Sequence, residues 1–289
     1  MNEGNAALSR LLHCLALEEV PGARDLYRGD CESRSHGRIF GGQVLAQALI
    51  AAGRSVDDRP AHSLQALFLR RGDPARPIDF EVERLRDGRA YSARRIVARQ
   101  GERVLLTMQA SFHRLEPGYQ HQSEAPTAAP PESLPTQSEA YEAARARIPE
   151  RVAGWASEAR AFDLRHSVTP SYLGGEPGLE TNLAWIRVPS RLPDDPLLHQ
   201  ALLAYASDLS LNDSALRPHT AGPALAISDM SSLDHAMWFH EAARADEWIL
   251  FPQRSPKAAQ GRGFATGEMY TREGRRIATL AQDSMMRPA

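Results

Sequence analysis

The sequence predicts an α+β fold made of two similar halves, each an antiparallel β-meander wrapped around one helix. The chain has 289 residues, which is enough for two domains of ordinary size. Strand-like segments separated by hairpin signals follow an apolar helix twice, in the same order. Two short motifs also recur with similar spacing, as expected for a diverged internal duplication.

The first half is expected to begin with a short helix and to centre on a second one. Leucines at helical spacing predict a helix over residues 7–17, which Pro21-Gly22 ends. Residues 26–28 have the composition of a strand. Gly41-Gly42 then precede a run of small apolar residues over 44–52. Because glycine and alanine allow close approach, this run predicts a helix packed tightly against its neighbours.

Four β-rich segments follow this helix, separated by breaks with hairpin chemistry such as Asp87-Gly88 and Gln100-Gly101. Residues 116–138 are rich in Pro, Ser, Thr, Gln and Glu and show no apolar periodicity, which predicts a linker. The expected strands are His62–Leu69, Ile78–Leu85, Tyr91–Ala98 and Arg103–Phe112.

The second half repeats this order, with a short helix expected over 139–147 and a central helix over 196–211. Ser63-Leu64 matches Ser232-Leu233, and the motif at Gln109 matches the motif at Gln282. The two glutamines are therefore expected at the same place in their repeats. The expected strands are Phe162–Val168, Leu183–Val188, Ala226–Phe239, Glu247–Gln253, Gly263–Tyr270 and Arg276–Met286.

A meander around one long helix, repeated in tandem, is the double hotdog architecture: two antiparallel sheets, each wrapped round a central long helix. We expect an N-terminal hotdog over residues 1–115, a linker over 116–160 and a C-terminal hotdog over 161–289.

Composition excludes several classes of partner. Apolar residues make up 42% of the chain and charged residues 24%, which is globular composition. A formal charge of −2 gives no basic field for nucleic acid or anionic membrane. Cys14 and Cys31 are too few for a disulfide framework, which favours a reducing, cytoplasmic location. No signal peptide and no membrane insertion are expected, because no apolar run approaches membrane-spanning length.

Ordered blocks along nearly the whole chain resemble the acyl-CoA thioesterase II family, whose members are double hotdogs. The resemblance implies an enzyme that hydrolyses fatty acyl-CoA to free fatty acid and coenzyme A, without a cofactor. Hotdog units often assemble further, so a homodimer or homotetramer is expected. The blocks include Ile39-Phe40-Gly41-Gly42-Gln43, Phe68-Leu69-Arg70-Arg71-Gly72-Asp73, Gln109-Ala110-Ser111-Phe112, Tyr205-Ala206-Ser207-Asp208 and Leu233-Asp234-His235-Ala236-Met237-Trp238-Phe239-His240.

The same resemblance implies three catalytic residues around one water molecule. The family places an aspartate on the second central helix, a threonine at the start of the next strand and a glutamine on the last strand. These positions are Asp208, Ser232 and Gln282. Serine replaces the family's usual threonine but keeps the hydroxyl group. A thioester has a good leaving group, so a positioned water, a base and an oxyanion stabiliser suffice.

Two further groups are candidates for binding the substrate. Backbone N–H groups at the start of the first central helix, at Gly41, Gly42 and Gln43, are natural oxyanion donors. Arg254, Lys257 and Arg262 have the charge to meet coenzyme A phosphates, although a solvated hairpin tip explains them as well.

Helical spacing supports Asp208 independently of the family. It follows Ala201 by seven residues and Ala204 by four, so its carboxylate is expected to point with the apolar face. A buried carboxylate costs on the order of several kcal/mol unless it is partnered. The alternative is a purely structural role, in which the aspartate caps a turn before Asn212. The first half carries no acid around Ala48–Ala52, so it is expected to be catalytically degenerate.

A Ser/His/Asp triad is not expected. Strand alternation would put Ser232 and Asp234 on one face and His235 on the other, and no G-x-S-x-G motif occurs. Structural hydrogen bonding is favoured for His235 and His240 over metal ligation, because no carboxylate or thiolate is suitably spaced. No metal is predicted.

Two other functions stay open. A hotdog enoyl-CoA hydratase would need an aspartate and a histidine paired on one helix, whereas His199 lies nine residues before Asp208. A non-catalytic acyl-CoA-binding protein is kept open by the serine at position 232. Turnover of a saturated acyl-CoA with thiol release would separate all three functions.

Overall fold

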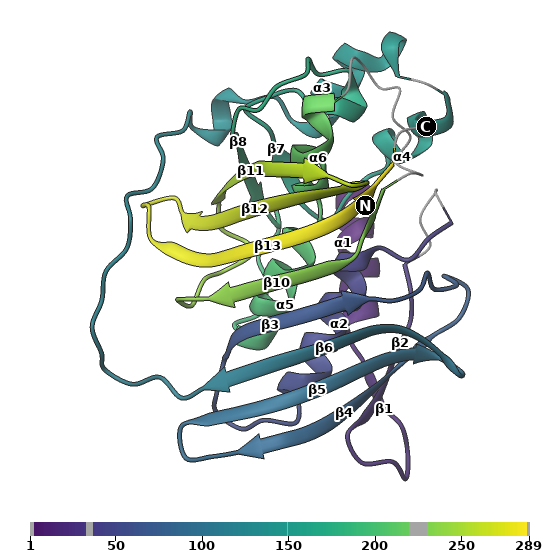
Figure 1. The fold of residues 1–289 in the computed structure, drawn as a ribbon, viewed down its shortest axis with the longest axis vertical. Helices are drawn as coiled ribbons and strands as arrows, with labels where there is room; N and C mark the ends of the chain where they lie inside the picture. Colours follow the sequence, from purple (N-terminus) through teal and green to yellow (C-terminus); the bar gives the residue numbers. More distant parts are fainter. Residues whose placement is uncertain (1–2, 33–36, 149, 220–229, 288–289) are drawn as a thin grey trace.

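The structure is a computed structural model that describes residues 3–32, 37–148, 150–219 and 230–287. The described residues of the first half form two helices and six strands, shown from purple to blue in Figure 1. They are α1 (Glu3–Leu15), β1 (Glu18–Glu19), β2 (Leu26–Gly29), α2 (Gly41–Gly53), β3 (Ala61–Phe68), β4 (Ile78–Asp87), β5 (Tyr91–Gln100) and β6 (Arg103–His113).

The connection and the second half follow. The connection contains η1 (Pro131–Ser133), α3 (Gln137–Ala144), η2 (Arg145–Arg147) and α4 (Glu150–Ser157). The second half contains β7 (Asp163–Arg165), η3 (Ser171–Leu173), β8 (Asn182–Arg187), α5 (Pro196–Ser207), α6 (Leu211–Leu216), η4 (Arg217–His219), β9 (Met230–Ser232), β10 (Asp234–Phe239), β11 (Ile249–Ala259), β12 (Arg262–Thr271) and β13 (Arg276–Met286).

All these strands belong to one antiparallel sheet. The order is β1-β2-β4-β5-β6-β3-β10-β13-β12-β11-β8-β7, and β9 pairs with β13. The junction between the halves is β3 against β10, where Leu64 faces Met237. The two sheets expected from the sequence are thus joined edge to edge, as Figure 1 shows at its centre.

The two central helices pack against each other antiparallel on one face of this sheet. Glycines allow this close contact at both ends. A Cβ on Gly42 would lie 2.5 Å from the Tyr205 carbonyl oxygen, and a Cβ on Gly53 would lie 2.4 Å from a Leu197 methyl group. One continuous apolar core therefore spans both halves.

The second central helix is shorter than predicted. The expected helix over 196–211 ends at Ser207, and α6 begins after a three-residue break. The N–H groups of Asp208 and Leu209 donate to the carbonyls three residues earlier, Tyr205 and Ala206, so the last turn tightens. Asp208 is the C-cap residue and lies outside the helix proper.

Other predicted elements agree with the structure in type and differ at their ends. The expected strand over 162–168 shrinks to β7, and α4 was not expected. The expected strand over 226–239 is divided into β9 and β10, while its residues 226–229 lie outside the described residues.

Residues 125–134 of the Pro-rich stretch pack against the second half-sheet. Figure 1 shows the stretch in teal along the left edge and top. Trp185 Nε1 donates to the Ala129 carbonyl at 2.8 Å, and Arg272 makes a bidentate ion pair with Glu132. A cluster of Trp185, Trp248 and Tyr270 is thereby shielded from water. Within the described residues, no helix is long and apolar enough to cross a membrane.

Candidate active site

Asp208 lies where the C-terminus of α5 meets the N-terminus of α2. Its side chain is buried, with 6% of the residue exposed. Oδ2 accepts a hydrogen bond from the Gly42 N–H at 2.9 Å, so the carboxylate sits on the positive end of the α2 dipole. Burial raises the pKa of Asp208, and the neighbouring His235 and the hydrogen bonds to the carboxylate oppose this rise. The predicted burial is confirmed, and its partners are distant in sequence, so turn capping does not explain it.

The structure brings the three predicted catalytic side chains together. Gln282 Nε2 lies 3.0 Å from Asp208 Oδ1 and 2.7 Å from Ser232 Oγ. The Ser232 hydroxyl lies 3.3 Å from the same carboxylate oxygen. These residues come from the end of α5, from β9 and from β13, so the fold assembles a compact polar cluster on the inner face of the sheet.

Two more polar residues reach this cluster and were missed from the sequence. Asn212 Oδ1 accepts from Gln282 Nε2 at 3.0 Å and from the Ser284 hydroxyl. Asn212 Nδ2 also lies 3.4 Å from Ser232 Oγ. Their spacing from predicted site residues could have identified them: Asn212 lies four residues after Asp208, and Ser284 lies two strand positions after Gln282.

His235 also joins the cluster, contrary to the predicted strand alternation. β9 pairs Ser232 with Ser284, whereas β10 pairs Ala236 with Ala281, so the strand gains one residue relative to β13. Such a bulge turns the following side chains to the other face. It puts Ser232 and His235 on the same, inner face, and no pattern in the sequence marks it.

The expected equivalence of Gln109 and Gln282 is wrong. Gln282 is 1% exposed and faces the helices, whereas Gln109 is exposed on the outer face of β6. Met108 and Ala110, on either side of Gln109, supply the inner face instead. The sequence match is therefore shifted by one residue from the structural match, and this shift moves Gln109 to the opposite face of the sheet.

The glycines at the start of α2 serve a close contact with Asp208. A Cβ on Gly41 would lie 2.8 Å from Asp208 Oδ2, so a larger residue would displace the carboxylate. The Gly42 N–H is already donated to Asp208, while the Gly41 N–H has no acceptor among the described residues. The Gln43 backbone N–H, the third predicted oxyanion donor, already donates to the Phe40 carbonyl. The buried side-chain amide of Gln43 donates to the Asp30 carbonyl and accepts from the Glu32 N–H, which anchors that segment.

The three predicted cations lie near the β11–β12 hairpin tip. Gln253 faces the core and Arg254 is exposed beside it, so Arg254 points to the outer face. Arg262 also lies on that face and pairs with Asp283 at 2.9 Å. Lys257 is exposed on the same hairpin. None of the three contacts the cluster around Asp208, and their part in coenzyme A binding stays a prediction.

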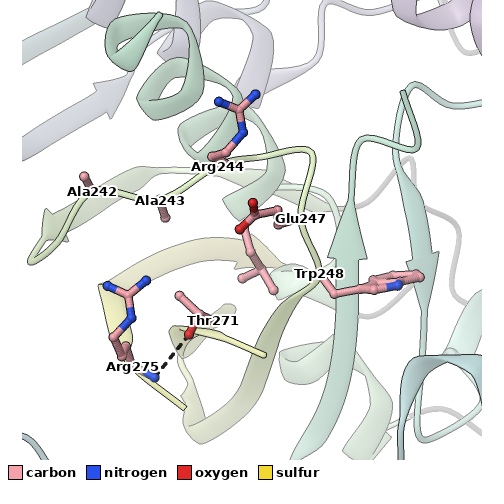
Figure 2. Close-up of a pocket in the computed structure, with 8 residues that line it drawn as sticks. Ala242, Ala243, Arg244, Glu247, Trp248, Thr271 and Arg275 are labelled. Carbon is pink, nitrogen blue, oxygen red and sulfur yellow. Dashed lines mark hydrogen bonds between the residues drawn. The ribbon is translucent and has the colours of Figure 1, made fainter. Parts of the chain in front are cut away.

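A hollow of about 100 Å³ lies beyond the opposite end of β13, and Figure 2 shows its lining side chains. Its volume corresponds to about three water molecules at roughly 30 Å³ each. Its two guanidinium groups are engaged, because Arg275 pairs with Glu241 and Arg244 pairs with Asp246. This hollow is too small for an acyl-CoA, since ligand pockets hold about 300–1,000 Å³.

Known families match both halves of the chain. A family model described as acyl-CoA thioesterase matches residues 156–285, and one described as acyl-CoA thioesterase N-terminal domain matches residues 32–113. Acyl-CoA thioesterase 2 of Haemophilus influenzae is 32% identical over 281 residues, covering 97% of this chain and 98% of that protein. The chain belongs to the acyl-CoA thioesterase family. Acyl-coenzyme A thioesterase 8 of Homo sapiens is 34% identical over 97% of this chain and 90% of that protein.

Solved structures of acyl-CoA thioesterases share the whole fold. The tesB protein of Mycobacterium avium subspecies paratuberculosis has a TM-score of 0.81 and 32% identity, covering 98% of this chain and 100% of that one. Acyl-CoA thioesterase II TesB2 of Mycobacterium marinum has a TM-score of 0.76 and 36% identity, covering 96% and 98%. The predicted family and double hotdog fold are confirmed.

Proposed function

We propose that this acyl-CoA thioesterase hydrolyses fatty acyl-CoA by means of a water molecule held and activated by Asp208, Ser232 and Gln282. The observation that carries the proposal is the convergence of these three side chains from separate elements in a buried position. A buried polar cluster is costly unless it is satisfied or functional, and here a carboxylate lies at its centre.

Asp208 is the general base. Its raised pKa makes the carboxylate a stronger base than an exposed aspartate. The carboxylate takes one proton from the water as the oxygen forms a bond to the thioester carbon. When the tetrahedral intermediate collapses, the carbon–sulfur bond breaks and the thiolate recovers that proton. The products are a fatty acid and the coenzyme A thiol.

Gln282 and Ser232 orient the water. Gln282 Nε2 carries two hydrogens but lies within 3.4 Å of four oxygen acceptors, so it cannot satisfy all of them at once. We assign one of these hydrogens to the oxygen of the attacking water, which takes the place of one protein acceptor. Holding it there converts a bulk encounter into an oriented attack.

The oxyanion is assigned to the N-terminus of α2. The Gly41 N–H points out of the first turn without an acceptor in the described part of the chain, next to Asp208. A developing negative charge is favoured there by the N–H group and by the helix dipole.

The proposal includes one active site per chain. The N-terminal hotdog (1–115) supplies Gly41 and Gly42, the segment 116–160 links the halves, and the C-terminal hotdog (161–289) supplies the three catalytic side chains. The separate family models for residues 32–113 and 156–285 support this division. The lack of an acid at the C-cap of α2, where Arg54 stands, supports a catalytically degenerate first half.

We also propose a homodimer or homotetramer in the cytoplasm. Two large apolar side chains, Leu67 and Trp238, are exposed on the neighbouring strands β3 and β10 where the halves join, which supports self-association. The free thiols of Cys14 and Cys31 support a reducing compartment. A monomeric mass in light scattering would contradict the oligomer.

The alternative enzyme class gains no support from the geometry. A hydratase needs a histidine paired with the aspartate on one helix, but His199 lies in the first turn of α5 and its Nδ1 accepts from the Ala245 N–H. The histidine near Asp208, His235, comes from strand β10, and its ring nitrogens contact Ser207 and Gln282. A non-catalytic binding protein is tested directly by turnover.

Thiol release from a series of saturated acyl-CoA substrates tests hydrolysis. A single turnover in ¹⁸O-labelled water then tests the mechanism. Direct attack by water places one ¹⁸O atom in every fatty acid molecule and none in Asp208. Label in the Asp208 carboxylate would instead reveal a covalent anhydride and would overturn the general-base role.

A further inference from the structure

We propose that His235 is a positioning residue of this site: supported by Ser207, its ring fixes which end of the Gln282 amide faces Asp208. The inference rests on the proposed function, because it concerns how the water-holding amide is oriented. Neither the family resemblance nor strand alternation assigns His235 a role in the reaction.

The contacts form a chain of three side chains behind the catalytic cluster. His235 is 1% exposed, and its Nδ1 lies 2.6 Å from Gln282 Oε1. Its Nε2 lies 2.9 Å from the Ser207 hydroxyl. Ser207 is the last residue of α5, directly before Asp208. The chain therefore ties β10 and β13 to the end of the helix that carries the base.

Proton positions follow from these contacts. Complete burial lowers the pKa of His235, so its ring is neutral and has one donor and one acceptor nitrogen. Gln282 Oε1 only accepts, so Nδ1 must carry the proton. Nε2 then accepts the single hydrogen of the Ser207 hydroxyl. The other possible acceptor of that hydrogen is the Ala204 carbonyl, at 2.7 Å.

The opposite tautomer would reverse the amide. In that state Nε2–H donates to Ser207, whose hydroxyl turns to the Ala204 carbonyl. The Nδ1 lone pair then faces Gln282, so the amide must rotate to offer its Nε2. Rotation would place Oε1 against the Asp208 carboxylate, where two oxygens repel, and would remove the donor that holds water. The tautomer and the amide orientation are therefore coupled.

This coupling predicts a specific kinetic signature. His235 contacts the amide oxygen and lies behind it, so loss of its donor should lower kcat and leave KM nearly unchanged. Asparagine has nearly the same shape as leucine but keeps an N–H donor. We expect kcat of His235→Leu to fall about 10- to 100-fold, within the range for lost preorganised groups, and His235→Asn to recover most of this loss.

His240→Leu is the matched control, because His240 is exposed on the same stretch of chain and contacts Thr279. It should keep its kcat within about twofold, since an exposed histidine far from the reacting groups adds no transition-state contact. Each variant is first checked for a cooperative melting transition and native circular dichroism. Equal kcat losses in folded His235→Asn and His235→Leu would overturn the donor role.

Asp208→Asn is measured in the same assay to separate the two proposals. Native turnover of Asp208→Asn overturns the proposed function. Loss of turnover in Asp208→Asn together with native kcat in His235→Leu overturns the inference alone.

Should His235→Leu not fold, Ser207→Ala and Ser207→Thr decide. We expect a several-fold kcat loss for alanine and recovery for threonine, because only threonine restores the hydroxyl donor. Equal kcat values would overturn the inference.

Discussion

The two halves of this thioesterase share a frame but use its inner face differently. Both carry a one-residue bulge at the corresponding place, between Ala61 and Ser63 opposite β6 and between Ser232 and Ala236 opposite β13. Superposing the bulges puts Ala61 at the place of Ser232, so the expected match of Ser63 with Ser232 is wrong. The β-ladder then puts Ala110 at the place of Gln282. The first half thus has methyl groups where the second has the two side chains that we propose hold the water.

On the next strand the contrast is reversed: the first half has a charged side chain where the second half has a methyl group. The inner face of β5 carries Arg94, fully buried, where the ladder of the second half places Ala265. The Arg94 guanidinium donates to the Ser55 hydroxyl and carbonyl and to the Asp87 carboxylate. All its contacts are structural, and they anchor the chain after α2. Each half therefore buries a charged group: Arg94 in the first half, with structural contacts, and Asp208 in the second, which we propose as the general base.

Of the substitutions that compare the two halves, replacing the proposed base Asp208 should lower kcat the most. Asp208→Asn should lower kcat on the order of 100- to 10,000-fold, because the amide cannot take a proton from water. Arg54→Ala, at the equivalent helix end of the first half, should leave kcat within about twofold, since no reacting group lies there. Thiol release by both purified, folded variants checks this, and near-native turnover by Asp208→Asn would remove its role.

Replacing Gln282 should give the next largest loss of kcat, and replacing Gln109 in the first half should give none. Gln282→Ala should lower kcat about 100- to 1,000-fold, as observed when one preorganised donor is lost. Gln109→Ala should leave both kcat and the melting temperature unchanged, because Gln109 is exposed on the outer face. A larger fall for Gln109→Ala would place the active site in the first half.

Serine at position 232 should matter through its hydroxyl alone. Ser232→Ala should lower kcat about 10- to 100-fold, since one hydrogen bond to a charged group is worth about 1.5–3 kcal/mol. Ser232→Thr restores the family's usual residue and should stay within about threefold of the native rate. Equal kcat values for the alanine and native proteins would show that the hydroxyl is not used.

The pH profile should show one acidic limb. Burial raises the pKa of Asp208, and only the ionised carboxylate acts as base. Activity should therefore fall as pH drops through this raised pKa, about tenfold per unit below it, beginning above the ordinary aspartate value of about 3.9. A flat kcat/KM in the acid range, measured where the protein stays folded, would contradict this assignment.

Arg94→Leu should affect only stability. It leaves the buried Ser55 carbonyl without its donor and should lower the free energy of unfolding by about 2–4 kcal/mol. The kcat of the folded variant should stay native, because Arg94 contacts none of the catalytic residues. Denaturant unfolding and thiol release, measured on the same sample, check both statements.

The element order was predictable from the hydrophobic period, and the family motifs pointed to three positions whose side chains the structure brings together. Asp208 was found twice over, by motif and by helical spacing. The His235 contact and the Gln109 mismatch were not predictable, because both depend on pleat and bulge. A bulge inverts every later side chain yet changes no residue type, so periodicity read along one strand cannot detect it.

The Gly42–Asp208 hydrogen bond joins residues 166 positions apart. The first half has no acid at the end of its own central helix, yet it supplies the helix N-terminus on which the Asp208 carboxylate of the second half rests. Expressed alone, the second hotdog would lack that support, and the two fragments mixed together should complement each other. Fusion into one chain holds the two unequal copies in a fixed one-to-one ratio, which free subunits of two kinds would not guarantee.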